Sequence, residues 1–96
     1  MPAYVIALEV IKDRDEFNKY RALVHDVLDK YEGKTVVSSE DAEVREGKWK
    51  YTKTVVIRFP SMGHAKRWYE SPEYQKILPI RLRAAATDLI LVEGKA

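Results

Sequence analysis

Arg81 is the residue whose type and position most strongly suggest chemistry. It follows Pro79 by two positions, and its neighbours Ile80 and Leu82 are apolar and are expected to be buried. A guanidinium held in such a place could bind a carboxylate or an enolate through two parallel hydrogen bonds. It could instead pair with a glutamate or satisfy a backbone carbonyl. Both interpretations of Arg81 are open on the sequence alone.

Aromatic residues on two predicted helices could form the wall of a small-molecule pocket. Trp68, Tyr69 and Tyr74 lie on the same stretch of chain as Arg81, and Tyr20 lies on an earlier helix. The tyrosine hydroxyls could donate hydrogen bonds or act as weak acids, whereas the same rings could simply pack between helix and sheet. The predicted ligand-binding residues are Tyr20, Trp68, Tyr69, Tyr74 and Arg81.

The two histidines, His25 and His64, are candidates for a base near neutral pH. His25 lies beside the predicted buried stripe of the first helix, although a lone helical histidine is often just partly exposed. His64 lies in the first turn of a later helix, where the dipole disfavours the charged imidazole, or else simply on the surface. The histidines lie on separate helices without a carboxylate at ligand spacing, so no metal site is predicted. The candidate catalytic residues are Arg81, Tyr69 and His25.

Length, charge and composition exclude several classes of protein. A chain of 96 residues is expected to form one domain over residues 1–96. Its net charge of +2 is too weak to argue for nucleic-acid binding. The lack of cysteine excludes disulfides and thiolate sites, and it fits a reducing cytoplasm. The sequence shows no leader signature and no apolar run near the roughly 20 residues that span a bilayer, so we expect a cytoplasmic protein without membrane contact. It shows no phosphate-loop motif, and we expect no cofactor.

Apolar patterns in the first half of the chain predict a strand, a helix and further strands. Residues 3–11 form a strand that is apolar on both faces. Asp13 and Glu16 look like a capping box for a helix, and Gly33 is a natural residue to end it. The further strands are predicted at residues 34–39, 42–46 (after a bend) and 50–59.

The second half predicts a jointed helix and a last strand. Ser61 is a good N-cap, and Ser71 restarts the helix with Pro72 at its first position. Pro79 is expected to break the helix, because proline lacks an N–H and clashes with the preceding turn. The last helical piece is predicted at residues 81–86, followed by a strand at residues 88–93.

The order of these elements is that of an α+β, ferredoxin-like fold. In this βαββαβ arrangement, both helices cover one face of a four-stranded antiparallel sheet. The other face would carry apolar residues of the first and last strands with nothing in the chain to cover them. Because large exposed apolar faces usually mark interfaces, we predict a symmetric homodimer whose sheets pack face to face.

Several stretches resemble one bacterial family. The run from Phe59 to Tyr74 is the most specific, and the other stretches are residues 1–6, 43–49, 75, 79–82 and 89–94. Nearly the whole chain resembles the domain-of-unknown-function family numbered thirteen-thirty, of the dimeric α/β-barrel superfamily. Gly63-His64 departs from the acidic or helix-favouring pair that is usual there. The resemblance implies a dimer whose two sheets close into a barrel, without an assigned reaction.

The residues and the resemblance leave three hypotheses for function. The first is a small-molecule pocket in each protomer, in a cofactor-independent oxygenase or isomerase. There Arg81 would stabilise an anion, and Tyr69, Tyr74 or His25 would move a proton. The second is a non-catalytic ligand-binding or structural dimer. The third is haem degradation, which some superfamily relatives perform, but the chain lacks a clear ligand histidine with an adjacent tryptophan and asparagine.

Overall fold

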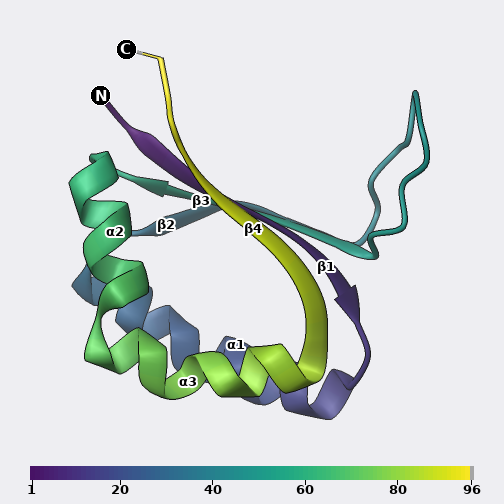
Figure 1. Cartoon of the computed structure of the whole chain (residues 1–96), viewed down its shortest axis with the longest axis horizontal. Helices are drawn as coiled ribbons and strands as arrows, with labels where there is room; N and C mark the ends of the chain where they lie inside the picture. The colour runs from purple at the N-terminus through teal and green to yellow at the C-terminus, as the bar shows by residue number, and fades with distance from the viewer. Residues whose placement is uncertain (96) are drawn as a thin grey trace.

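An antiparallel sheet forms one layer of the protein, and helices form the other (Figure 1). The structure is a computed structural model that describes residues 1–95. The strands, in the spatial order β2-β3-β1-β4, are β1 (Ala3–Ile11), β2 (Lys34–Ser39), β3 (Lys53–Phe59) and β4 (Ala85–Glu93). The helices are α1 (Arg14–Lys30), α2 (Met62–Glu70) and α3 (Pro72–Ala84). The predicted ferredoxin-like fold is confirmed, with α2 and α3 together in the place of its second helix.

The three predicted helix starts are confirmed by their caps. The side chains of Asp13, Ser61 and Ser71 each accept the backbone N–H of the residue three positions later, at 3.1, 3.2 and 3.1 Å. Each cap satisfies an N–H that the first turn of a helix leaves without a partner. These local signals fix where α1, α2 and α3 begin.

Gly33, after α1, is required for close packing. The left-handed residue of this turn is Glu32, with φ of 63°, and the Gly33 N–H donates to the Leu28 carbonyl at 2.8 Å. A Cβ atom on Gly33 would lie 2.7 Å from the ring of Phe59. Glycine therefore lets the end of α1 approach β3.

The predicted break at Pro79 is wrong, because α3 continues through it. Pro79 lies on the exposed side of the helix, whereas Ile77, Leu78 and Arg81 are buried on the other side. Packing of this buried side holds the helix together across the N–H that proline lacks.

The predicted helical piece at residues 81–86 ends earlier, and β4 begins three residues before its predicted start. The Ala84 carbonyl accepts the N–H groups of Lys12 and Asp13 at 2.8 and 3.0 Å, which fixes the end of α3 beside the end of β1. Ala85 is already extended and pairs with Ile11. Pairing with β1 therefore outweighs the helix propensity of the alanines.

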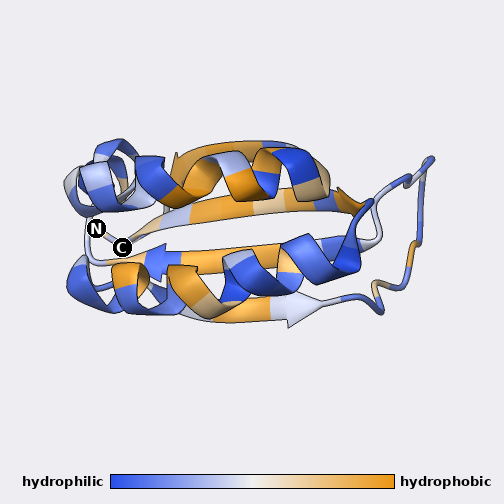
Figure 2. Ribbon diagram, turned by 90° about the horizontal axis from the view of Figure 1, so that it is seen from below, coloured by the Kyte–Doolittle hydropathy of each residue, from blue (hydrophilic) through white to orange (hydrophobic). Residues whose placement is uncertain are grey.

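The connection between β2 and β3, residues 40–52, projects away from the two layers (Figures 1 and 2). The predicted strand at residues 42–46 is wrong, and β3 begins at Lys53 rather than at residue 50. The pairing of β3 with β1 starts at Lys53 opposite Glu9. Before Lys53 the regular pairing stops, because the Ile11 N–H donates to the side-chain hydroxyl of Thr52, at 3.2 Å, and not to a backbone carbonyl.

The sheet is apolar on both faces, and its strands are mostly orange in Figure 2. On β1, Val5 and Ala7 are buried beneath the helices, so the alternating residue Ile6 points to the opposite face. Ile6 pairs with Val56 on one side and with Ile90 on the other. Ile6, Val56 and Ile90 therefore form a row of apolar side chains on the open face of the sheet, and Ile90 is 55% exposed.

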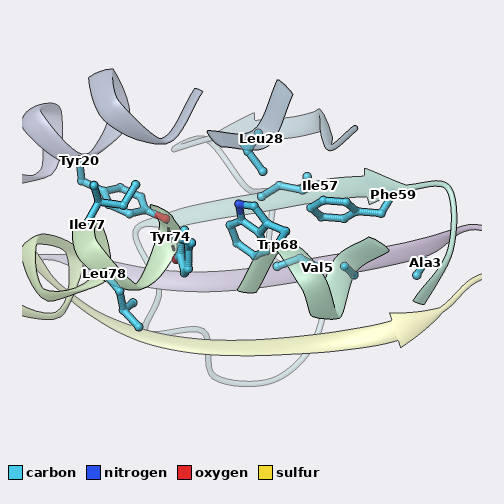
Figure 3. Packing of buried hydrophobic residues seen from close by; sticks show 11 residues of the cluster. Ala3, Val5, Tyr20, Leu28, Ile57, Phe59, Trp68, Tyr74, Ile77 and Leu78 are labelled. Carbon is cyan, nitrogen blue, oxygen red and sulfur yellow. Dashed lines mark hydrogen bonds between the residues drawn. The ribbon is translucent and has the colours of Figure 1, made fainter. Parts of the chain in front are cut away.

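The hydrophobic core lies between the sheet and the helices (Figure 3). Its largest fully buried side chains are Trp68, Tyr74, Phe17, Phe59 and Val5. Across residues 1–95, every helix is too short or too polar to cross a membrane.

Candidate functional site

A cavity of about 310 Å³ lies between the helices and the face of the sheet that they cover. Most of its lining is aliphatic or aromatic, and it includes side chains of every helix and strand. The charged side chains at this cavity are Glu9, Arg21, Lys53 and Arg81, and His25 also contributes to the lining. An apolar cavity with a few polar groups is the usual form of a small-molecule site.

Three of these charged side chains are buried, which is unusual for a chain of this size. Glu9 on β1 is 2% exposed, Lys53 on β3 is 5% exposed, and Arg81 on α3 is 4% exposed. Glu9 and Lys53 are direct cross-strand partners. Arg81 reaches the cavity from the buried side of α3, which Pro79 does not interrupt. The fold therefore brings one acidic and two basic side chains from three distant segments to one cavity.

Several polar atoms at the cavity have no hydrogen-bond partner among residues 1–95. They are Glu9 Oε1, Trp68 Nε1, Arg81 Nε and Arg81 Nη1. Three of the four are N–H donors, and buried donors without partners are costly in a folded protein. The unsatisfied donors match a ligand that supplies oxygen acceptors.

Burial and the two cations act on Glu9 in opposite directions. Burial raises the pKa of the Glu9 carboxyl above its ordinary value, although Arg81, Lys53 and a hydrogen bond from Thr87 oppose the rise. The Thr87 hydroxyl donates to Glu9 Oε2 at 3.4 Å. Because the net pKa is raised, the protonated form of Glu9 is favoured more than in water.

Lys53 shows the complementary effect. Burial lowers the pKa of its ammonium group, and the positive charge of Arg21 lowers it further. Lys53 Nζ donates to Ser38 Oγ at 3.1 Å. The uncharged amine of Lys53 is therefore favoured more than in water.

Tyr20 and Tyr74 meet beside the cavity (Figure 3), and their hydroxyls lie 2.8 Å apart. Burial raises the pKa of both phenols, and that of Tyr20 is well above its ordinary value. Tyr20 and Trp68 line the cavity, whereas Tyr74 lies behind them with its ring centroid 4.1 Å from that of Trp68. Tyr74 therefore supports the wall of the cavity.

The other two predicted catalytic residues, Tyr69 and His25, are not enclosed beside Arg81. Tyr69 is half-buried and packs against Trp68 and Tyr74, outside the cavity lining. His25 contributes to the edge of the cavity, but its side chain is 76% exposed and lies 3.6 Å from Asp29. The geometry therefore gives neither residue an enclosed position for proton transfer.

His64 lies away from the cavity and joins two segments. Its Nδ1 lies 2.7 Å from Ser61 Oγ, and its Nε2 lies 3.1 Å from Glu32 Oε2. These contacts link the start of α2 to the turn after α1. Within residues 1–95, no cluster of three or more histidine and carboxylate side chains is arranged to hold a metal ion.

Among the buried charged residues at the cavity, Glu9 and Lys53 were not predicted as site residues. The signal was present, because strand alternation places Glu9 on the same side as Val5 and Ala7. The same alternation places Lys53 with Ile57 and Phe59. A charged residue on the buried side of a predicted strand was therefore the sequence signal that could have identified Glu9 and Lys53 as site residues.

Similar solved structures show the same fold at low sequence identity. A protein of unknown function from Rhodopseudomonas palustris is 16% identical, with a TM-score of 0.80 over 99% of this chain and 83% of its own. A dimeric ferredoxin-like protein of unknown function from Jannaschia sp. is 8% identical, with a TM-score of 0.77 over 98% and 100%. SnoaB, a cofactor-independent oxygenase from Streptomyces nogalater, is 13% identical, with a TM-score of 0.69 over 99% and 94%.

At these identities the likeness shows the fold alone. No curated protein sequence matches the chain. The family comparison is decisive for membership, because its match runs over residues 2–95 and so includes every element that forms the cavity. The chain therefore belongs to the family described as Domain of unknown function (DUF1330).

Proposed function

We propose that the cavity binds a small organic anion, or a carbonyl compound that becomes an enolate, and that Arg81 holds its charged oxygen. The observation that carries this proposal is the group of unpartnered N–H donors on Arg81 and Trp68 at a cavity whose lining is mostly apolar. Hydrogen bonds from a buried guanidinium to a carboxylate or enolate are stronger than neutral ones. A bound anion would also offset the excess of positive charge around Glu9.

The reaction that this arrangement supports best is proton transfer at a carbon next to a carbonyl group. The Glu9 carboxylate would accept the proton, and Arg81 would stabilise the resulting enolate. Return of the proton to another carbon gives an isomerase, whereas reaction of the enolate with dioxygen gives a cofactor-independent oxygenase. Glu9 replaces Tyr69 and His25 in this role, because it is enclosed and has a raised pKa.

The alternative is a ligand-binding protein without catalysis. It requires the same donors at the same cavity, and it needs no role for Glu9 beyond balancing two cations. Exchange of substrate hydrogen with solvent deuterium separates the two functions. A bound carbonyl compound whose C–H exchanges with wild-type protein but not with Glu9→Gln indicates catalysis, whereas binding without exchange indicates the alternative.

We also propose that the protein acts as a homodimer through the open face of the sheet. The apolar row that contains Ile6, Val56 and Ile90 supports this assembly, because it leaves large side chains facing water. Two structural neighbours that are described as dimeric also support the proposal of a dimer.

Substitution of Arg81 tests the binding proposal. Arg81→Met keeps a long side chain and removes the charge, and Arg83→Met is the matched control because the Arg83 side chain is 64% exposed. We would screen small carboxylates and enolisable ketones by thermal shift and measure the hits by calorimetry. Since a hydrogen bond to a charged group contributes about 1.5–3 kcal/mol, the Kd should rise about 10- to 100-fold in Arg81→Met and stay unchanged in Arg83→Met. Equal affinity of Arg81→Met and wild type would overturn the proposal.

A further inference from the structure

Lys53 is a buried primary amine that the proposed anion site does not use. It is the first residue of β3, on the same side of the strand as Ile57 and Phe59. Its side chain lines the cavity that Arg81 also lines, and it is 5% exposed. A lysine is rarely buried to this extent without an acidic partner.

The surroundings of Lys53 favour a reactive amine. Its Nζ donates to the hydroxyl of Ser38, and among residues 1–95 no carboxylate forms an ion pair with it. Glu9 pairs with Lys53 across the strands, yet the two side chains do not form an ion pair. Burial and the charge of Arg21 lower the pKa of this ammonium. A lysine whose charge is disfavoured in an apolar cavity has the properties of a Schiff-base nucleophile.

We propose that Lys53 captures the carbonyl carbon of a small oxo acid as a Schiff base while Arg81 holds the carboxylate of the same molecule. This inference rests on the proposed function of the cavity and names its substrate class. A permanently charged guanidinium and an amine that can lose its charge match the two groups of an oxo acid. The cavity of about 310 Å³ limits such a substrate to a small molecule.

The capture step balances with residues of the cavity. The uncharged amine adds to the carbonyl carbon, a C–N bond forms, and one amine proton moves to the carbonyl oxygen. The resulting hydroxyl leaves as water after it accepts a proton from the Glu9 carboxyl. The remaining iminium proton then returns to Glu9, so amine and ketone give imine and water without an oxidant or reductant.

Reductive trapping on the wild-type protein tests this directly. The protein is incubated with pyruvate, acetoacetate or phenylpyruvate and with cyanoborohydride, and the modified lysine is located by peptide mass spectrometry. Lys50 is exposed and serves as an internal control for non-specific reaction. We expect the adduct on Lys53 to exceed that on Lys50 by about tenfold or more.

Variants identify which part of the site is responsible. Lys53→Met and Lys53→Arg should lose this adduct, and circular dichroism checks that each variant folds. Arg81→Met should reduce trapping of pyruvate but leave trapping of acetone unchanged, because acetone has no carboxylate.

The outcomes separate this inference from the proposed function. No excess of adduct on Lys53 over Lys50 with any of the three acids overturns the covalent step. If those acids still stabilise the protein through Arg81, the anion site stands alone. If they neither react nor bind, and no carboxylate or ketone binds in an Arg81-dependent manner, the proposed function fails as well.

Discussion

At the scale of single residues, Glu9 shows that burial can outweigh the attraction of two nearby cations. Two cations act on this carboxyl, yet burial still raises its pKa. The attraction of Arg81 and Lys53 therefore does not offset the loss of water around the charge. A carboxyl group held in this way destabilises the folded protein when it ionises, and such groups are concentrated at functional sites.

This balance predicts the pH dependence of a Glu9→Gln variant. Because the folded-state pKa of Glu9 is raised, the folded protein binds this proton more tightly than the unfolded chain does. The contribution of Glu9 to stability is thus fully present below the unfolded pKa, and it is lost as pH rises through the folded pKa. Urea unfolding should show Glu9→Gln gaining stability relative to wild type as the pH rises from about 4 to about 7. Glutamine has no proton to lose, so the variant avoids the loss of stability that wild type undergoes when Glu9 ionises.

The control for that measurement is Glu46→Gln, in the exposed connection between β2 and β3. Its stability relative to wild type should change little over the same range. If wild type instead gains stability relative to Glu9→Gln as the pH rises, the attraction of Arg81 and Lys53 for the ionised carboxylate outweighs the cost of its burial.

The residue types of the site were partly predictable from sequence. Arg81 was singled out because Ile80 and Leu82 were expected to be buried beside it, and that premise is wrong for Leu82, which is 63% exposed. Arg81 is buried because it shares the buried side of α3 with Ile77 and Leu78. Tyr69 and Trp68 are adjacent on α2, and which of the two faces the cavity depends on how the helix is rotated against the sheet. That rotation is set by packing of distant segments, so helical spacing alone did not resolve it.

At the scale of elements, α3 shows how packing overrides a local signal. The capping residues Asp13, Ser61 and Ser71 located the starts of α1, α2 and α3 correctly, because a cap involves a few neighbouring residues. A proline inside a helix removes one hydrogen bond, but its full effect depends on what the opposite side of the helix contacts. Here the buried side carries Ile77, Leu78 and Arg81.

Pro79→Ala should therefore stabilise the protein. Alanine restores a backbone N–H and removes the ring, and the difference in helix propensity is up to about 3 kcal/mol. Part of that gain is offset, by about 0.4–1 kcal/mol, because proline also restricts the unfolded chain. Chemical unfolding should show a net increase in the free energy of unfolding.

Pro72→Ala is the matched control, because Pro72 lies in the first turn of the same helix where its missing N–H costs nothing. It should give no gain or a small loss. A loss of stability in Pro79→Ala would show that the proline shapes α3 in a way that packing at the cavity requires.

At the scale of the whole molecule, the open sheet face predicts assembly. Ile90→Asp places a charge in the proposed interface, and two symmetry-related copies of the residue are affected at once. With about 1.5 kcal/mol or more for each buried isoleucine, the dimer should weaken by about 100-fold or more. Sedimentation velocity at micromolar concentration should then show a monomer.

Leu82→Asp is the matched control, since Leu82 is 63% exposed and lies on α3, on the helix side of the sheet. It should leave the dimer intact. Sedimentation of the wild-type protein as a monomer at the same concentration would contradict the predicted assembly.

The pairing of β1 with β4 has a consequence for synthesis on the ribosome. β1 is an inner strand, and it pairs with β4 along its whole length, from Ala3 opposite Glu93 to Ile11 opposite Ala85. Contacts between such distant residues form late and slow the folding of a chain. Until β4 emerges, one edge of β1 lacks its partner, so we expect the nascent chain to present an unpaired strand edge of the kind that chaperones bind.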